Sequence, residues 1–365
     1  MLQNKYVNIT SDDLINSINP LGGQSISGSS KYVEEYEEEV KNLFGKEYTV
    51  AVNSGTVAIY CALKAIGVGA GDEVILPATA VIMSGIPALM LGAKVRFADI
   101  TEKPGFGLDH SSVKKLINSN TKAVISVPLW GYPVPMQELT ELCNESNIVL
   151  IEDVSQSHGT TWKGKLLGTY GSLGCFSTHE RKLITTGEGG FILTDDSKLA
   201  HNMRVFRRYG IDQVEHSIKL GMNFKLNGLS AALGITQVKK LYQKISLREA
   251  VAIAIKKGIS GLSWLEEINV EDHSQQNYYA LVFRIIDTNI DVKKLEDHLY
   301  TNGIISDTWR YKFKPLYKYP VFKNESDICE RAEALIPKVI TLPCHEGMTQ
   351  NDISTVINAM NNFIK

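Results

Sequence analysis

The sequence predicts an α/β fold, in which a large domain with a mostly parallel sheet between helices precedes a smaller C-terminal α+β domain. Short apolar segments alternate with helical segments from residue 48 onward, a pattern typical of βαβ units. The chain has 365 residues, which exceeds what one small core accommodates. Its 44% hydrophobic and 21% charged residues are ordinary values for a globular protein with a large core.

The individual elements follow from hydrophobic spacing. Val33, Tyr36, Val40 and Phe44 recur at helical intervals, and Gly45 is a helix stop. The expected strands are short continuous apolar runs, as in a sheet covered on both faces. Strands are expected at residues 48–52, 73–76, 94–97, 123–127, 148–151, 174–177, 190–193 and 279–286, and further helices at 57–66, 81–91, 134–146 and over most of 225–255.

These assignments divide the chain into three parts. Residues 1–30 are polar and rich in Gly and Ser, so a loop-like N-terminal arm is expected there. Residues 31–235 contain the alternating strands and helices of the large domain. Residues 236–365 are expected to form the smaller α+β domain.

The charge balance and the cysteines argue against several classes of protein. Lys plus Arg is 38 and Asp plus Glu is 40, so no basic excess indicates a nucleic-acid partner or an anionic membrane surface. The five cysteines are widely spaced without a CxxC pair, so neither a disulfide framework nor a metal site is expected. Unpaired cysteines, the lack of a signal-peptide pattern and the lack of an apolar run of about 18 residues favour a cytoplasmic protein.

A carboxylate stands where α/β sheets place ligands. Asp153 follows the apolar strand at 148–151, at its carboxyl end. A charge buried at that edge needs a partner, because burying a lone charge is costly. Taken alone, the residue is explained equally well as a helix N-cap.

Lys182 lies among Gly, Ser and Thr residues between two expected strands. A lysine in such a loop is usually solvent-exposed. A nucleophilic lysine must instead lose its proton, which requires burial or a neighbouring cation. Arg181 is adjacent and His179 is three residues away, so each is a candidate for the neighbouring cation that lowers the pKa of a nucleophilic lysine.

Ser54-Gly55-Thr56 lies between an expected strand and an expected helix, which places backbone N–H groups and a hydroxyl at a helix N-terminus. That arrangement is an anion site, although plain N-capping explains it equally well in isolation. The glycines between residues 159 and 174 do not form a GxGxxG dinucleotide fingerprint. A Rossmann oxidoreductase is therefore disfavoured.

Together and in this order, these segments resemble the DegT/StrS family of sugar aminotransferases, which are fold-type-I enzymes that use pyridoxal 5′-phosphate. The resemblance covers roughly residues 20–360. Its most specific segments are Ser54-Gly55-Thr56, Glu152-Asp153-Val154-Ser155-Gln156-Ser157-His158-Gly159, Phe176-Ser177-Thr178-His179-Glu180-Arg181-Lys182, Thr186-Gly187-Glu188-Gly189-Gly190, Gly221-Met222-Asn223-Phe224-Lys225-Leu226 and Tyr311-Lys312-Phe313-Lys314-Pro315-Leu316.

The resemblance implies roles for the catalytic centre. Lys182 would be the Schiff-base lysine and the carrier of protons. Asp153 would pair with the pyridine nitrogen of the cofactor and keep it protonated. Gln156 would hydrogen-bond the phenolic oxygen, and His179 is a candidate contact for the substrate.

The resemblance also implies how the phosphate is held. Gly55 and Thr56 would bind it through the helix N-terminus, and Ser177 would add a hydroxyl. Asn223 would reach the phosphate of the neighbouring subunit's cofactor, which implies a homodimer with shared active sites.

Three positions depart from the family pattern. Val81 stands where an aromatic residue usually stacks on the cofactor ring, and it lacks the aromatic contribution of about 0.5–1.5 kcal/mol. Lys225 replaces a common arginine, and Pro128 replaces a common histidine.

The function that the resemblance implies is transfer of an amino group from glutamate or glutamine to a keto sugar, nucleotide-linked, in amino-sugar biosynthesis. A keto-cyclitol acceptor and a cofactor-binding regulatory protein without turnover remain alternatives. A sugar dehydratase is disfavoured, because those members carry histidine at the position of Lys182. The sequence does not identify the sugar, the nucleotide or the carbon that is aminated.

Overall fold

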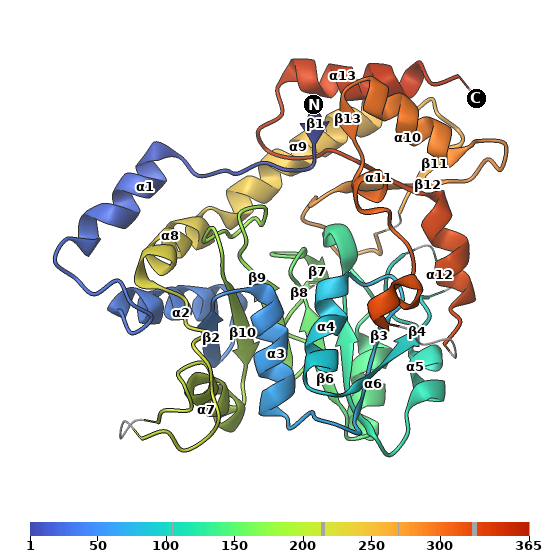
Figure 1. The fold of residues 1–365 in the computed structure, drawn as a ribbon. Helices are drawn as coiled ribbons and strands as arrows, with labels where there is room; N and C mark the ends of the chain where they lie inside the picture. The colour runs from blue at the N-terminus through green and yellow to red at the C-terminus, as the bar shows by residue number, and fades with distance from the viewer. Residues whose placement is uncertain (102, 104, 213–215, 269, 323–326, 365) are drawn as a thin grey trace.

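The computed structural model describes residues 1–101, 103, 105–212, 216–268, 270–322 and 327–364. Its large sheet confirms the predicted α/β class (Figure 1). In spatial order the strands are β2 (Tyr48–Val52), β10 (Gly190–Thr194), β9 (Leu173–Ser177), β6 (Val149–Asp153), β5 (Thr121–Ser126), β3 (Glu73–Pro77) and β4 (Lys94–Ala98). Strand β10 is antiparallel to both of its neighbours, and the remaining neighbours pair in parallel.

The expected helices of the large domain are present as α2 (Lys31–Phe44), α3 (Gly55–Ala65), α4 (Ile82–Met90), α6 (Gln137–Glu145) and α8 (Gly228–Lys239). Two further helices, α5 (His110–Leu116) and α7 (Ser197–Phe206), were not predicted from the sequence. Gly45 directly follows α2 and confirms the predicted helix stop, and it adopts the left-handed conformation common at helix C-termini. Helices α3 and α4 lie side by side against the sheet (Figure 1).

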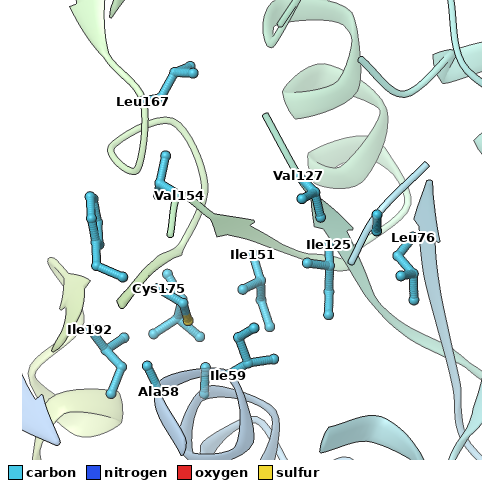
Figure 2. Close-up of a cluster of buried hydrophobic side chains, with 14 of the residues drawn as sticks. Ala58, Ile59, Leu76, Ile125, Val127, Ile151, Val154, Leu167, Cys175 and Ile192 are labelled. Carbon is cyan, nitrogen blue, oxygen red and sulfur yellow. The ribbon is translucent and has the colours of Figure 1, made fainter. Parts of the chain in front are cut away.

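The core of the large domain lies between α3 and the central strands. Ile59 from α3 packs toward Ile151 of β6, Cys175 of β9 and Ile192 of β10, all of them buried (Figure 2). Because both faces of these strands are covered, their apolar residues run continuously instead of alternating. The carboxyl ends of the parallel strands therefore meet at one rigid edge, where ligands bind in open α/β sheets.

The C-terminal part contains a second core and a smaller antiparallel sheet in the order β11-β12-β14. Its elements are α9 (Leu241–Gly258), β11 (Leu265–Glu267), β12 (Leu281–Ile285), α10 (Val292–Thr301), β13 (Ile304–Ile305), α11 (Asp307–Tyr311), α12 (Glu330–Leu335), β14 (Val339–Leu342) and α13 (Gln350–Asn361). Residues of α12 pack on the first core instead. The division of the chain at residue 235 stays a prediction.

The N-terminal arm is more ordered than its composition suggests. Strand β1 (Leu2–Gln3) pairs in parallel with β13 in the C-terminal part, and residues 11–18 form α1 (Ser11–Ile18). The expectation of a loop was therefore wrong for residues 11–18. Thr10 and Asp13 form a capping box there, and Asp13 also pairs with Lys240 at 2.6 Å. In the described part of the chain, no helix is long and apolar enough to cross a membrane.

Candidate active site

Asp153 lies at the carboxyl end of β6, and the residue is only 3% exposed. Its Oδ2 accepts a hydrogen bond from Ser84 Oγ of α4 at 2.5 Å, and its Oδ1 accepts one from the backbone N–H of Ser155 at 3.2 Å. Among the described residues it forms no ion pair with a cationic side chain. A buried carboxylate with only neutral donors fits a cationic ligand group, such as a protonated pyridine nitrogen, better than it fits a helix cap.

Gln156 follows Asp153 by three residues, and its side-chain amide is oriented by the backbone. Its Oε1 accepts from the N–H of Trp130 at 2.7 Å, in the short 3₁₀ turn Leu129–Gly131 that follows β5. The amide oxygen is therefore occupied and the amide nitrogen is left to donate. That is the polarity needed to bind a phenolate oxygen.

The N-terminus of α3 forms a cradle with the end of β9. Ser54 caps the helix by accepting from the N–H of Val57 at 3.1 Å, so the N–H groups of Gly55 and Thr56 have no carbonyl within the helix. A Cβ on Gly55 would lie 2.5 Å from Cβ of Ser177, so only glycine permits this close approach. Two backbone donors, the helix dipole and a hydroxyl thus converge, as an anion such as phosphate requires.

Lys182 lies in the segment between β9 and β10, and it is half-buried. Its Nζ lies 3.4 Å from Oη of Tyr279 and 5.0 Å from the centre of the Tyr279 ring. Tyr279 is buried and precedes β12 in the C-terminal part. The structure therefore brings together a lysine and a tyrosine separated by 97 residues, a contact that no local pattern signals.

Asn277 joins the loop after β6 to the residue that contacts Lys182. Its Nδ2 donates to the carbonyl oxygens of Gln156 and His158, each at 3.0 Å, and its Oδ1 accepts from the N–H of Tyr279 at 2.9 Å. The side chain is fully buried, and a Cβ on Gly131 would overlap it. These hydrogen bonds consequently fix the position of Tyr279 relative to the loop after β6 that carries Gln156.

Glu152, beside Asp153 on β6, has a different task. Its carboxylate is buried and accepts from the backbone N–H groups of Gly168, Tyr170 and Gly171 at 2.7–2.8 Å. Burial raises the pKa of this carboxyl, and the three N–H donors oppose that shift. Because all its partners are loop backbone, we assign Glu152 a structural role.

The remaining predicted residues lie around this centre or near it. Val81 is the half-buried N-cap residue of α4, the helix that also carries Ser84. His179 Nδ1 accepts from the N–H of Arg181 at 3.3 Å, and burial lowers the pKa of His179, so the neutral ring is favoured. Asn223 is exposed, and the carbonyl of the next residue accepts from the N–H of Asn53. Its reach into a neighbouring subunit stays a prediction.

Asp307 is a buried carboxylate near this centre that the sequence analysis missed. It begins α11, and desolvation raises its pKa to about 6, although Asn4, Arg310 and Arg181 oppose the shift. A carboxyl whose folded pKa exceeds its unfolded value contributes stability at acidic pH and loses that contribution as pH rises through 6.

This shift predicts the effect of replacing Asp307. Asp307→Asn is expected to raise stability at pH 8 by about 3 kcal/mol at most, and by only about half as much at pH 5, where the unfolded carboxyl is already ionised but the folded one is still mostly protonated. Urea unfolding at both pH values measures the difference, with the exposed Asp272→Asn as control. Equal effects of Asp307→Asn at the two pH values would contradict this account of Asp307.

With this geometry established, comparison with known proteins identifies the chain. The family model described as the DegT/DnrJ/EryC1/StrS aminotransferase family matches residues 11–361. The chain belongs to this family. Its members are aminotransferases that use pyridoxal 5′-phosphate, and this DegT/DnrJ/EryC1/StrS protein is therefore an enzyme that transfers amino groups. The resemblance seen in the sequence is thereby confirmed.

Individual relatives of this DegT/DnrJ/EryC1/StrS aminotransferase are consistent with the family assignment. It is 30% identical to the GDP-perosamine synthase of Caulobacter vibrioides, over 93% of this chain and 92% of the relative. It is 28% identical to the UDP-4-amino-4,6-dideoxy-N-acetyl-beta-L-altrosamine transaminase of Campylobacter jejuni, over 98% and 96% of the two chains. The structure of S. venezuelae DesV, solved in complex with a ketimine intermediate, matches with a TM-score of 0.87 at 27% identity, over 97% and 95% of the two chains.

Proposed function

We propose that this aminotransferase moves an amino group from glutamate or glutamine to the keto group of a nucleotide-linked sugar. The observation that carries this proposal is that relatives aligned over more than nine-tenths of the chain are named for GDP- and UDP-linked amino sugars. These names differ in nucleotide, and one specifies a 4-amino sugar while another specifies a 3-oxo sugar. The nucleotide and the carbon therefore stay open in the proposal.

The proposed roles follow from the geometry of the chain's own residues. Pyridoxal 5′-phosphate, when bound, supplies an electron sink for the pair released as the donor's Cα proton leaves. Lys182 moves that proton between the donor's Cα and the cofactor's C4′, and Tyr279 orients its amine. Asp153 holds the proton on the pyridine nitrogen, and Gln156 donates to the phenolic oxygen.

The phosphate is proposed to lie in the cradle formed by Gly55, Thr56 and Ser177. Asn223 would act on the phosphate bound in a second subunit, so the protein is proposed to be a homodimer with shared sites. Exposed apolar side chains on α1 and near Asn223 support an interface between copies, because neighbouring exposed apolar residues are typical of protein–protein contact sites. They are Leu14, Ile15 and Ile18 on α1 and Leu220 and Met222 near Asn223.

A cytoplasmic location is proposed because all five cysteines are free and buried.

Cationic groups beside Lys182 support an anionic acceptor. Arg181 Nη1 donates to Oη of Tyr311, while its Nε is buried and has no partner among the described residues. Arg310 lies over the same tyrosine ring, 5.9 Å from its centre. Two guanidinium groups that flank Tyr311 suit the diphosphate of a nucleotide sugar better than a neutral cyclitol, and His179 is a further candidate contact.

The Tyr279 hydroxyl provides a test of the proposed centre. Tyr279→Phe is expected to lower kcat about 10-fold, because the hydrogen bond that orients the Lys182 amine is lost. Tyr278→Phe is the matched control, since the hydroxyl of Tyr278 contacts Glu249, away from Lys182. Steady-state rates with a saturating donor make the comparison. If the two variants were equally active, Tyr279 would have no part in orienting Lys182.

The substrate class is tested by following the nitrogen atom. The enzyme with pyridoxal 5′-phosphate and ¹⁵N-glutamate is incubated separately with GDP-linked keto sugars, UDP-linked keto sugars and a keto-cyclitol, and the products are identified by mass spectrometry. We expect ¹⁵N to appear on a nucleotide sugar as glutamate becomes 2-oxoglutarate. Labelling of a keto-cyclitol alone would replace the proposed acceptor, and no 2-oxoglutarate under any condition would favour a regulatory protein without turnover.

A further inference from the structure

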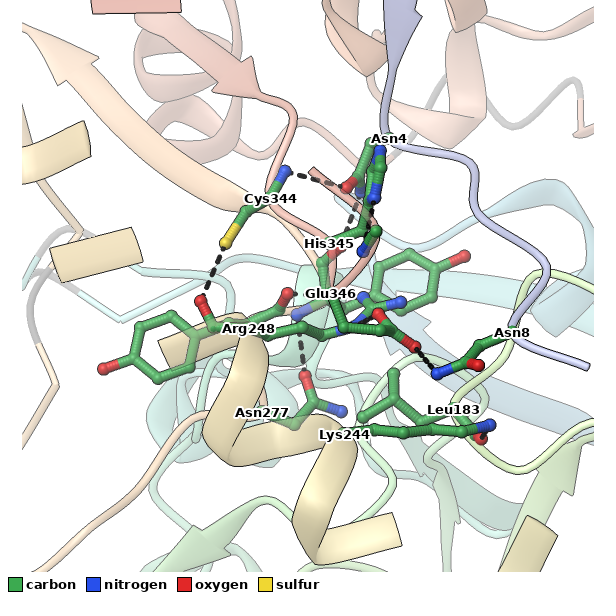
Figure 3. Close-up of polar contacts among 12 residues, drawn as sticks. Asn4, Asn8, Leu183, Lys244, Arg248, Asn277, Cys344, His345 and Glu346 are labelled. Atoms are coloured by element: carbon green, nitrogen blue, oxygen red, sulfur yellow. Dashed lines mark hydrogen bonds and ion pairs between the residues drawn. The ribbon is translucent and has the colours of Figure 1, made fainter. Parts of the chain in front are cut away.

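Lys244 is a buried lysine of α9 to which the proposed function gives no role. It is only 2% exposed, and its Nζ donates to the carbonyl of Leu183 at 2.8 Å (Figure 3). The same Nζ donates to Oε1 of Gln237 at 2.6 Å. Both acceptors are neutral, and burial lowers the pKa of Lys244 to about 8. Keeping an ammonium group in such surroundings is costly, so the contact with Leu183 needs a functional explanation.

The carbonyl that accepts from Lys244 belongs to the Leu183–Ile184 peptide group, which begins one residue after Lys182. The N–H of the same peptide group, carried by Ile184, donates to Nδ1 of His158 at 3.2 Å. His158 is buried, and desolvation lowers its pKa to about 3, so its ring is neutral and Nδ1 is the acceptor. The Leu183–Ile184 peptide is thus held at both ends, by Lys244 on its oxygen and by His158 on its nitrogen.

The ends of the same segment are fixed by the sheet. The N–H of Thr186 donates to the carbonyl of Thr178 at 2.8 Å, and the N–H of Thr178 donates to the carbonyl of Gly189 at 2.8 Å. Within the segment, the N–H of Lys182 bonds the carbonyl of His179 at 2.9 Å. Lys244 adds a backbone contact from α9, 61 residues further along the chain, to the side-chain contacts that Arg181 makes with Tyr311 and Lys182 makes with Tyr279.

Helix α9 is itself anchored one turn further on. Arg248 Nε contacts Glu346 Oε2 at 2.6 Å, with both side chains buried, and Glu346 Oε1 accepts from Asn8 of the N-terminal arm at 3.2 Å (Figure 3). Arg248 also donates to the carbonyl of Tyr278, beside Tyr279. The position of Lys244 is therefore tied to the C-terminal part that presents Tyr279.

We propose that Lys244 is a positioning residue for Lys182: by holding the Leu183–Ile184 peptide against His158, it fixes the direction in which the Lys182 side chain leaves the backbone. A lysine side chain has four rotatable bonds, so the placement of its amine depends on a fixed starting point. Displacing a reacting group by about 1 Å costs about 100-fold in rate. This inference rests on the proposed role of Lys182.

The test compares Lys244→Met, Lys244→Arg and, as control, Lys257→Met on the exposed face of the same helix. Single-turnover reaction of the loaded enzyme with glutamate gives a maximal rate and a half-saturating concentration separately. We expect Lys244→Met to lower the maximal rate about 10- to 100-fold at an unchanged half-saturating concentration. Lys244→Arg should recover much of the loss, and Lys257→Met should match the wild type.

Hydrogen exchange of the protein without cofactor provides a readout that is independent of turnover. Peptides covering residues 180–185 should exchange faster in Lys244→Met, while peptides from β6 should not change. Unaltered exchange in residues 180–185, or a rate loss that follows the folded fraction and that arginine does not restore, would overturn the inference. Wild-type enzyme that does not react with glutamate would instead refute the proposed function, and the exchange data would still decide the contact of Lys244.

Discussion

Replacing Lys182 by alanine is expected to lower amino transfer by at least about 10³-fold. General acid–base groups contribute about 10²–10⁴-fold, and Lys182 would supply this proton transfer in both half-reactions as well as the covalent link to the cofactor. Its Nζ lies 3.4 Å from Tyr279 Oη, and no other lysine amine lies within hydrogen-bonding distance of that hydroxyl in the described part of the chain. The loss is measured as the rate of amino transfer from glutamate, with the formation of 2-oxoglutarate as the readout.

Two comparisons separate loss of chemistry from loss of structure. Lys165→Ala removes an exposed lysine on β8 (Lys165–Leu166) and should leave the rate unchanged. Added small primary amines should partly restore the amino-transfer rate of the Lys182→Ala variant, because they supply the missing base. A Lys182→Ala protein that transfers amino groups at a near wild-type rate would place the essential amine elsewhere.

Asp153→Asn is expected to retain pyridoxal 5′-phosphate and to lower kcat about 10²- to 10³-fold. Asparagine can still hydrogen-bond to the ring nitrogen, but it cannot hold a proton there by charge, and the electron sink weakens. The bond from Ser84 and the burial of this position keep the side chain in place in either form. Cofactor content by absorbance and kcat from steady-state kinetics measure the two parts of the prediction.

Glu152→Gln is the matched control, because Glu152 is the adjacent buried carboxylate on the same strand. Its partners are backbone N–H groups, and an amide nitrogen placed against them leaves buried donors unsatisfied. We expect a loss of about 1–3 kcal/mol in stability with little change in kcat of the folded protein. The assignment of Asp153 fails if Asp153→Asn keeps its kcat, or if the two variants lose kcat equally.

The large domain was predictable because its signals are local. The runs that became β6 and β9 are short, continuous and apolar, as buried parallel strands must be, and Asp153 and Ser177 end those strands. Strands β2 and β9 run in the same direction on either side of the antiparallel β10, so their carboxyl ends lie at the same edge, and the cradle of Gly55 and Ser177 follows from strand order once the sheet forms. The helix α1 was missed although a signal was available, since Thr10 and Asp13 have capping-box spacing.

The contacts that connect the two parts of the chain were not predictable in this way. Tyr279 reaches Lys182 across 97 residues, and Asn277 reaches Gln156 across 121. Lys244 and Asp307 are charged residues in segments whose spacing gives no sign of burial, and tertiary packing alone buries them. Such side chains carry no periodic pattern, so the sequence offers only the residue types and not the pairing.

The most direct test of the central claim is the visible absorption of the wild-type protein with pyridoxal 5′-phosphate, recorded before and after glutamate is added. The assignment of Lys182 and Asp153 predicts a band from the lysine-linked cofactor that decays on addition of glutamate to the spectrum of the amine form, with one 2-oxoglutarate released per site. No visible band on adding the cofactor, or a band that persists with every amino donor, would contradict it.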